Sequence, residues 1–157
     1  MLAAWWNTPE VLRLLLAAGA DMEARDEAEG DTALMFAARW NTREGVELLL
    51  RAGADVNARN KYGCTALRST LWWLSWDIEV IPALIEAGAD IEERYEHGMT
   101  PLTFAARQSP EAVELLLDAG VDPNAKDDEG KRALDYAREA PEFEGTEALR
   151  RLEEASE

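Results

Sequence analysis

The tetrapeptide Ala18-Gly19-Ala20-Asp21 recurs along the chain and decides the fold. It returns as Ala52-Gly53-Ala54-Asp55, as Ala87-Gly88-Ala89-Asp90 and, with one change, as Ala119-Gly120-Val121-Asp122. The glycines of successive copies are 34, 35 and 32 residues apart. A period of this length is typical of repeat architectures, in which each unit packs only against its neighbours.

A second glycine and a three-residue segment keep the same phase. After each tetrapeptide and a short polar stretch comes Gly30, Gly63, Gly98 or Gly130. The segments that follow these glycines are Thr32-Ala33-Leu34, Thr65-Ala66-Leu67, Thr100-Pro101-Leu102 and the weaker Arg132-Ala133-Leu134. We therefore expect one domain, 1–157, with repeat units at about 1–30 (truncated at its N-terminal side), 31–63, 64–98, 99–130 and 131–157 (a C-terminal cap).

Each unit is predicted to hold two short helices and a polar turn or hairpin. The first helix follows the Thr and is small and apolar, and the second ends at the glycine of the tetrapeptide. Eleven residues before that glycine stands a residue whose side chain can cap a helix N-terminus. These four caps are Thr8, Thr42, Asp77 and Ser109. Their constant spacing predicts second helices of equal length.

These landmarks resemble the ankyrin repeat. The family pattern of Gly, Thr-Pro-Leu-His, Ala-Ala, a Leu-rich second helix and Gly-Ala-Asp-Val-Asn is similar to residues 30–57 and 98–124. The resemblance implies an all-α solenoid of stacked helix-turn-helix repeats with projecting turns or short hairpins, acting as a non-enzymatic protein-binding module. The family's histidine is replaced, in chain order, by Met35, Arg68, Thr103 and Asp135. Losing its hydrogen bonds lowers the expected coupling between repeats.

The third unit and the two ends depart from a uniform array. Two extra residues lie between the helices of the third unit, around Trp72–Trp76, on the side that binds partners in proteins this one resembles. A polar helix over 146–154 closes the C-terminal end. Residues 2–4 correspond to the end of a first helix, so either the array continues before Met1 or a partner covers this edge. We expect self-association through its apolar residues, Val11, Leu12, Leu14 and Leu15.

Composition removes several classes of function. The chain has 32 acidic and 16 basic residues, a net charge of −16, which is the wrong sign for binding nucleic acid or anionic membranes. Its single cysteine, Cys64, cannot form an internal disulfide, and its single histidine cannot alone make a usual zinc site. We expect a cytoplasmic protein without enzyme activity, metal or cofactor. The acidic turns 26–31 and 127–129 lack the spacing of a calcium loop and are interpreted as solvated.

Six tryptophans are the unusual feature of the sequence. Aligned on the residue that closes each first helix, the next two positions read Trp5-Trp6, Arg39-Trp40, Trp72-Trp73 and Arg107-Gln108, and Trp76 lies in the insertion. In proteins that this one resembles, this column lines the concave groove that binds partners, together with the tips of the turns. The tips here carry Glu29, Asp31, Lys61, Tyr62, Tyr95, Glu96, His97, Asp128 and Glu129.

We interpret the tryptophan column as a binding groove with an acidic rim and a basic or amphipathic protein as its partner. The predicted contact residues are Trp5, Trp6, Arg39, Trp40, Trp72, Trp73, Trp76, Arg107, Gln108, Tyr62, Tyr95 and His97. Two alternatives stay open. In one, the chain is a structural segment of a longer array and its tryptophans pack between repeats. In the other, it is an inhibitor or immunity-type protein that blocks a basic site on its target.

Overall fold

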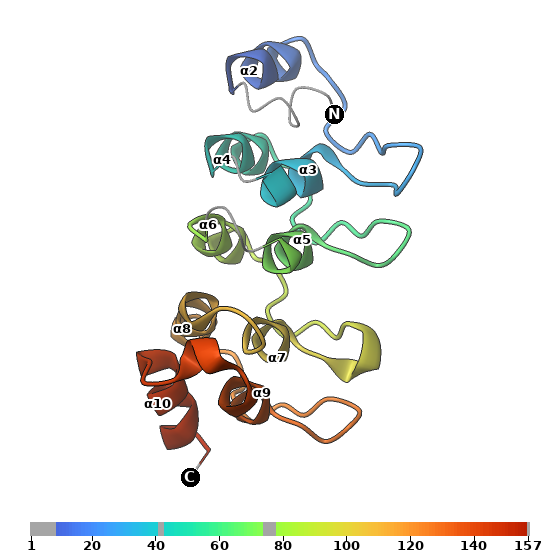
Figure 1. Ribbon diagram of the computed structural model, residues 1–157. Helices are drawn as coiled ribbons and strands as arrows, with labels where there is room; N and C mark the ends of the chain where they lie inside the picture. The colour runs from blue at the N-terminus through green and yellow to red at the C-terminus, as the bar shows by residue number, and fades with distance from the viewer. Residues whose placement is uncertain (1–8, 41–42, 74–77, 157) are drawn as a thin grey trace. The chain divides into compact units, whose positions relative to one another are not determined.

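The computed structural model describes residues 9–40, 43–73 and 78–156, and within these ranges it is all-helical, with no β-strand (Figure 1). The α-helices are α2 (Pro9–Ala17), α3 (Ala33–Trp40), α4 (Arg43–Arg51), α5 (Ala66–Trp72), α6 (Val80–Glu86), α7 (Pro101–Ala105), α8 (Pro110–Asp118), α9 (Ala133–Glu139) and α10 (Glu147–Glu154). Two 3-10 helices are η1 (Glu96–Gly98) and η2 (Pro141–Phe143). The predicted all-α repeat solenoid is confirmed. No helix in the described ranges is both long and apolar enough to cross a membrane.

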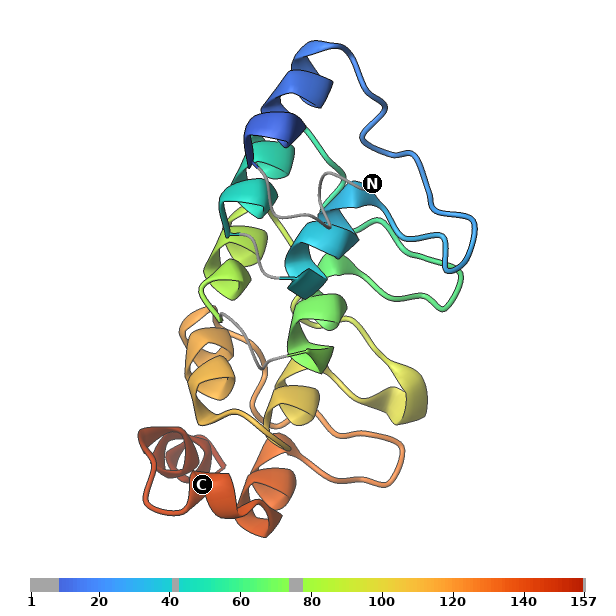
Figure 2. The same ribbon diagram turned by 45° about the horizontal axis from the view of Figure 1, so that its top comes forward.

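The helices form two compact units, residues 1–89 and 90–157. In the first unit α3 packs against α5 and α4, and α4 packs against α2 and α6. The helices therefore lie in two rows, α3 and α5 in one and α2, α4 and α6 in the other, with the turns projecting beside the first row (Figure 2). In the second unit α7 packs against α8 and α9, and α10 packs against α8 and α9.

Small and branched apolar side chains build the core between the rows. Ala37 and Ala38 of α3 are almost completely buried, and so are Val46 and Leu49 of α4. Alanine allows the short first helices to approach one another closely, while the leucines of the second helices fill the space between rows. Met35, at the position of the family's histidine, is 1% exposed and belongs to this core.

A helix cap explains where α8 begins. The hydroxyl of Ser109 accepts a hydrogen bond from the backbone N–H of Ala112 at 3.2 Å, as a cap of α8 should. The other three predicted caps, Thr8, Thr42 and Asp77, lie outside the described residues.

The prediction of equal second helices is wrong in the third unit. Helices α2, α4 and α8 have nine residues each, whereas α6 has seven and begins at Val80. Pro82 has no N–H to donate to the carbonyl of Ile78, and the N–H of Ile81 donates to that carbonyl instead at 3.0 Å. The turn over residues 78–81 is therefore of 3-10 type, and the first α-helical residue is Val80.

Threonine and aspartate replace the missing histidine locally in the second unit. The backbone N–H of Thr100 donates to the hydroxyl of Thr103 at 2.7 Å, and the N–H of Thr103 donates to the hydroxyl of Thr100 at 3.2 Å. In the next repeat, the carboxylate of Asp135 accepts from the N–H of Arg132 at 2.8 Å. These side chains cap their own helices.

Arginines in the turns connect one repeat with the next. Arg25 Nη1 donates to the carbonyl of Gly30 in its own turn at 3.1 Å and to the carbonyl of Arg59, one repeat later, at 2.5 Å. In the second unit, Arg94 Nη1 donates to Gly98 at 2.7 Å and to Lys126 at 2.6 Å. The same position therefore closes a turn and links it to its neighbour in both units.

Candidate functional site

Four exposed aromatic side chains of the first unit form what we call the aromatic surface: Trp40, Trp72, Trp73 and Tyr62. Their exposed fractions are 44%, 55%, 48% and 65%. The rings of Trp40 and Trp73 stack, with centroids 6.5 Å apart and planes 23° from parallel. The structure places these three tryptophans on the surface, so packing inside the core does not account for them.

The ends of the first helices turn these tryptophans outward. Leu71 is fully buried, and α5 ends at the residue after it, Trp72. Trp73 is the C-cap, and its N–H donates to the carbonyl of Thr70 at 3.2 Å. Two successive indoles therefore follow the last buried leucine, at the position where Trp40 ends α3 in the preceding repeat.

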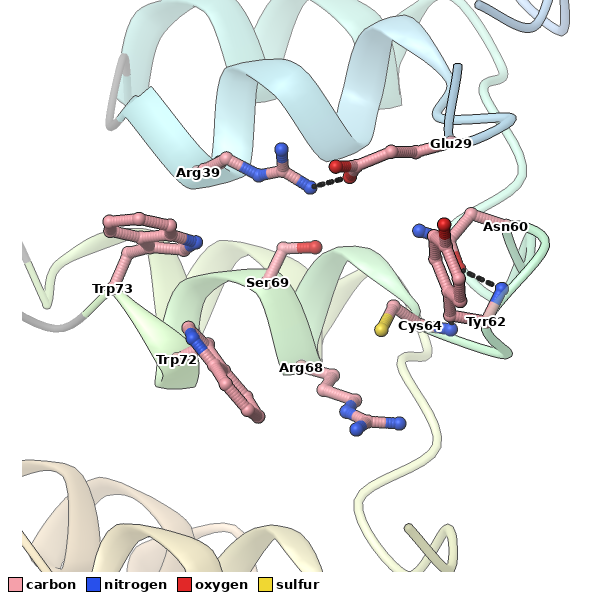
Figure 3. A pocket seen from close by; sticks show the side chains of 9 residues that line it. All are labelled: Glu29, Arg39, Asn60, Tyr62, Cys64, Arg68, Ser69, Trp72 and Trp73. Carbon is pink, nitrogen blue, oxygen red and sulfur yellow. Dashed lines mark hydrogen bonds and ion pairs between the residues drawn. The ribbon is translucent and has the colours of Figure 1, made fainter. Parts of the chain in front are cut away.

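A pocket of about 300 Å³ adjoins the aromatic surface (Figure 3). It is lined by Glu29, Arg39, Asn60, Tyr62, Cys64, Arg68, Ser69, Trp72 and Trp73. Trp73 and Tyr62 lie toward opposite ends of the pocket, Ser69 lies between them, and Arg39 faces them from α3. Arg68 lies one helical turn before Trp72, and its guanidinium carbon is 6.0 Å from the centre of that indole.

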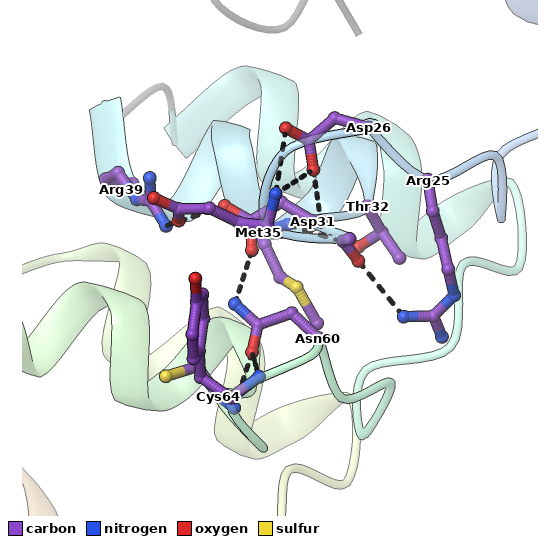
Figure 4. A network of polar contacts seen from close by, with 11 residues as sticks. Arg25, Asp26, Asp31, Thr32, Met35, Arg39, Asn60 and Cys64 are labelled. Carbon is purple, nitrogen blue, oxygen red and sulfur yellow. Dashed lines mark hydrogen bonds and ion pairs between the residues drawn. The ribbon is translucent and has the colours of Figure 1, made fainter.

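A buried ion pair fixes Arg39 in the pocket wall. Arg39 Nη2 is 2.6 Å from Asp31 Oδ2 and 3.2 Å from Glu29 Oε2. The other oxygen of Asp31 accepts from the side-chain amide of Asn60 at 2.6 Å (Figure 4). Asp31 has no exposed surface, so the prediction that it lies at an exposed turn tip is wrong. A buried carboxylate of this kind requires such partners, and it holds Arg39 with 18% of its side chain exposed.

Tyr95 is also misplaced by the sequence prediction. It is 6% exposed and meets Phe104 edge to face, with ring centroids 6.0 Å apart. Its N–H donates to the carbonyl of Met99 at 2.8 Å, as the N–H of Asn60 does to that of Cys64 in the preceding turn. Tyr95 therefore occupies a turn-closing position rather than the tip.

The remaining predicted contacts are partly exposed and partly undescribed. His97 is exposed, with φ of 60°. Arg107 and Gln108 are exposed in the second unit. Trp5, Trp6 and Trp76 lie outside the described residues.

Arg107 belongs to a second, smaller pocket of about 220 Å³, in the second unit, that sequence reasoning missed. Its guanidinium carbon lies 5.8 Å from the centre of the Tyr136 ring, which also lines this pocket. The hydroxyl of Tyr136 donates to Asp127 Oδ2 at 2.5 Å. This bond raises the pKa of Tyr136 to about 12. Burial acts to raise the pKa of Asp127, but the bond from Tyr136 and two backbone amides outweigh it and lower the pKa.

Arg68 lines the pocket beside the aromatic surface but is absent from the predicted contact residues, and helical spacing is the signal that could have found it. Arg68 and Trp72 are four residues apart on α5, which places a guanidinium beside an indole on one helix face. The sequence pattern by itself marks Arg68 only as the replacement for the family's histidine. Among the residues that the structure describes, no group of three or more His, Cys, Asp or Glu could hold a metal ion.

Comparison with known families identifies the repeats. A family model described as ankyrin repeats in three copies matches residues 1–95, and one described as ankyrin repeats in many copies matches residues 84–137. The comparison with curated proteins finds no match.

Proposed function

The chain belongs to the ankyrin-repeat family, whose repeats are generally protein–protein interaction modules and typically not enzymes, and from this we propose that it binds a partner protein through the aromatic surface. The observation that carries the proposal is the exposure of Trp40, Trp72 and Trp73 beside a pocket. Tryptophan is enriched among residues that dominate binding energy, because its large ring loses much contact with water when a partner covers it.

Charge supports a basic or amphipathic partner. Residues 1–89 contain 13 acidic and 8 basic residues, and residues 90–157 contain 19 and 8. Turn residues of the second unit such as Glu96, Asp128 and Glu129 are exposed. A partner with positive charge gains in association rate from this field, whereas nucleic acid is repelled by it. We place the protein in the cytoplasm, where a single reduced cysteine is the ordinary state.

The test is the affinity of a partner for tryptophan variants. A partner captured with the wild-type chain is purified, and its dissociation constant is measured with Trp40→Ala, Trp72→Ala and Trp73→Ala. Each change should weaken binding by about 2 kcal/mol, roughly 30-fold. Because the three side chains are about half exposed, the thermal unfolding midpoint should stay close to that of the wild type.

Arg51→Lys is the control, since the Arg51 side chain is 73% exposed on α4, is not part of the aromatic surface, and keeps its charge in this change. It should leave the affinity unchanged. Equal affinities for all four variants would refute the proposal, and so would loss of the thermal transition in each tryptophan variant.

A further inference from the structure

The pocket beside the aromatic surface is lined largely by flat groups. Indole and phenol rings come from Trp72, Trp73 and Tyr62, and two guanidinium planes come from Arg39 and Arg68. Both guanidinium groups already lie near aromatic rings, Arg39 at 5.8 Å from the centre of Phe36 and Arg68 at 6.0 Å from that of Trp72. Planar, weakly hydrated guanidinium groups stack on aromatic faces, so these walls suit a flat ligand.

The charges of the lining disfavour an ionic occupant. A cationic side chain would meet two guanidinium groups, and the carboxylate of Glu29 already accepts a hydrogen bond from Arg39. An anionic side chain would meet Arg39, which Asp31 and Glu29 already pair, and Arg68, which already lies beside the indole of Trp72. The field of a chain with a net charge of −16 also repels an anion. An uncharged aromatic ring avoids both costs, because its electron-rich face is attracted to a cation without requiring a counter-ion.

The size of the pocket fits one large side chain. Its volume of about 300 Å³ is at the lower end of the range for ligand pockets, roughly 300 to 1,000 Å³. Two of its lining residues, Ser69 and Cys64, are small. A whole helix or strand of a partner would lie over the aromatic surface, with a single side chain entering the pocket.

We infer that this pocket takes an uncharged aromatic side chain, tryptophan or phenylalanine, as the anchor of the partner protein. The inference rests on the proposed function and makes it specific. The basic residues of the partner then contact the acidic parts of the chain outside the pocket, and they do not enter it.

Four blocked amino acids test the inference by nuclear magnetic resonance titration of the whole chain. The probes are N-acetyl-tryptophanamide, N-acetyl-leucinamide, N-acetyl-argininamide and the amide of N-acetyl-glutamate. We expect the tryptophan probe to shift the signals of Ser69 and Trp73 with a dissociation constant on the order of millimolar. It should bind at least about threefold more tightly than each of the other three probes, the gain expected from stacking on a cation.

Variants locate the site. Tyr62→Ala should weaken binding of the tryptophan probe at least about threefold, and folding should be retained because the ring is 65% exposed. Arg51→Lys should leave the shifts unchanged, since this exposed residue does not line the pocket. Equal or tighter binding of the arginine, glutamate or leucine probe would overturn the inference, and so would the absence of any shift at Ser69 and Trp73. These outcomes are distinct from a failure of the proposed function, which is measured with the full partner.

Discussion

Two turns of the second unit lie close together at Gly98. Its φ is +68°, and a Cβ added to it would clash with the carboxylate of Asp128 and would lie 3.0 Å from the backbone nitrogen of Asp128. The N–H of Asp128 also donates to the carbonyl of His97 at 2.9 Å. A side chain at position 98 therefore forces apart two turns that are joined by a backbone hydrogen bond.

We predict that Gly98→Ala lowers the free energy of unfolding by about 2 to 3 kcal/mol, measured by urea denaturation. Gly130→Ala is the matched control, because Gly130 has a similar φ of +80° with nothing within 4 Å of an added Cβ. It should lose only about 1 kcal/mol, the cost of the left-handed conformation. Equal losses would show that the turns separate without cost.

The bond between Tyr136 and Asp127 makes stability depend on pH at both extremes. The raised pKa of Tyr136 means that its contribution is complete below the ordinary value of 10 and is lost as the pH rises through about 12. The lowered pKa of Asp127 means that its contribution is present above the ordinary value of 3.8 and is lost as the pH falls through the lower folded value.

Tyr136→Phe should therefore remove the tyrosine that ionises near pH 12, measured by the absorbance of tyrosinate. It should also raise the midpoint pH of acid unfolding, since the pKa of Asp127 loses one of its lowering contacts. Tyr62→Phe should retain both features. A Tyr136→Phe chain with an unchanged acid midpoint would show that the backbone amides alone hold the carboxylate.

Helix α2 presents an apolar face to solvent. Val11, Leu14 and Leu15 are 44%, 70% and 41% exposed, while Leu12 is buried. Three of the four residues of the predicted apolar edge are therefore exposed. We predict that the chain self-associates through this face and that Leu14→Lys weakens the association at least about tenfold, because a charge then enters an apolar contact. Sedimentation equilibrium over a range of concentrations measures it. A wild-type chain that stays monomeric at the highest concentration would contradict the prediction.

The sequence predicts the elements of this fold better than their side-chain partners. Glycines and helix caps are local signals that mark each repeat in the sequence. The helix pairs therefore lie where these signals predict them. The burial of Asp31 depends on Arg39 and on Asn60, which lies 29 residues away, and no single-repeat alignment shows that pairing. The exposure of Trp40 and Trp73 could be predicted because their column falls just after the last buried residue of each first helix.

Charge is distributed unevenly over the whole chain, and the excess of acid in residues 90–157 should steer a basic partner. We predict that the association rate falls as salt is added, because screening shortens the field to about 8 Å at physiological ionic strength. Glu129 and Glu142 are both exposed. The double variant Glu129→Gln, Glu142→Gln should lower the association rate by about twofold at low salt and leave the dissociation rate unchanged. Stopped-flow measurements provide both rates. A rate independent of salt would remove the steering role.

The arginine links between turns bear on how such a chain changes length. Each link runs from an arginine to a main-chain carbonyl about one repeat later, as from Arg25 to Arg59 and from Arg94 to Lys126. Every amino acid carries that carbonyl, so the link does not constrain the identity of the residue that accepts it. When one such segment is duplicated in frame, the copy can form the arginine link to the repeat before it and to the repeat after it. Recombination within the array can then lengthen the chain without waiting for compensating substitutions.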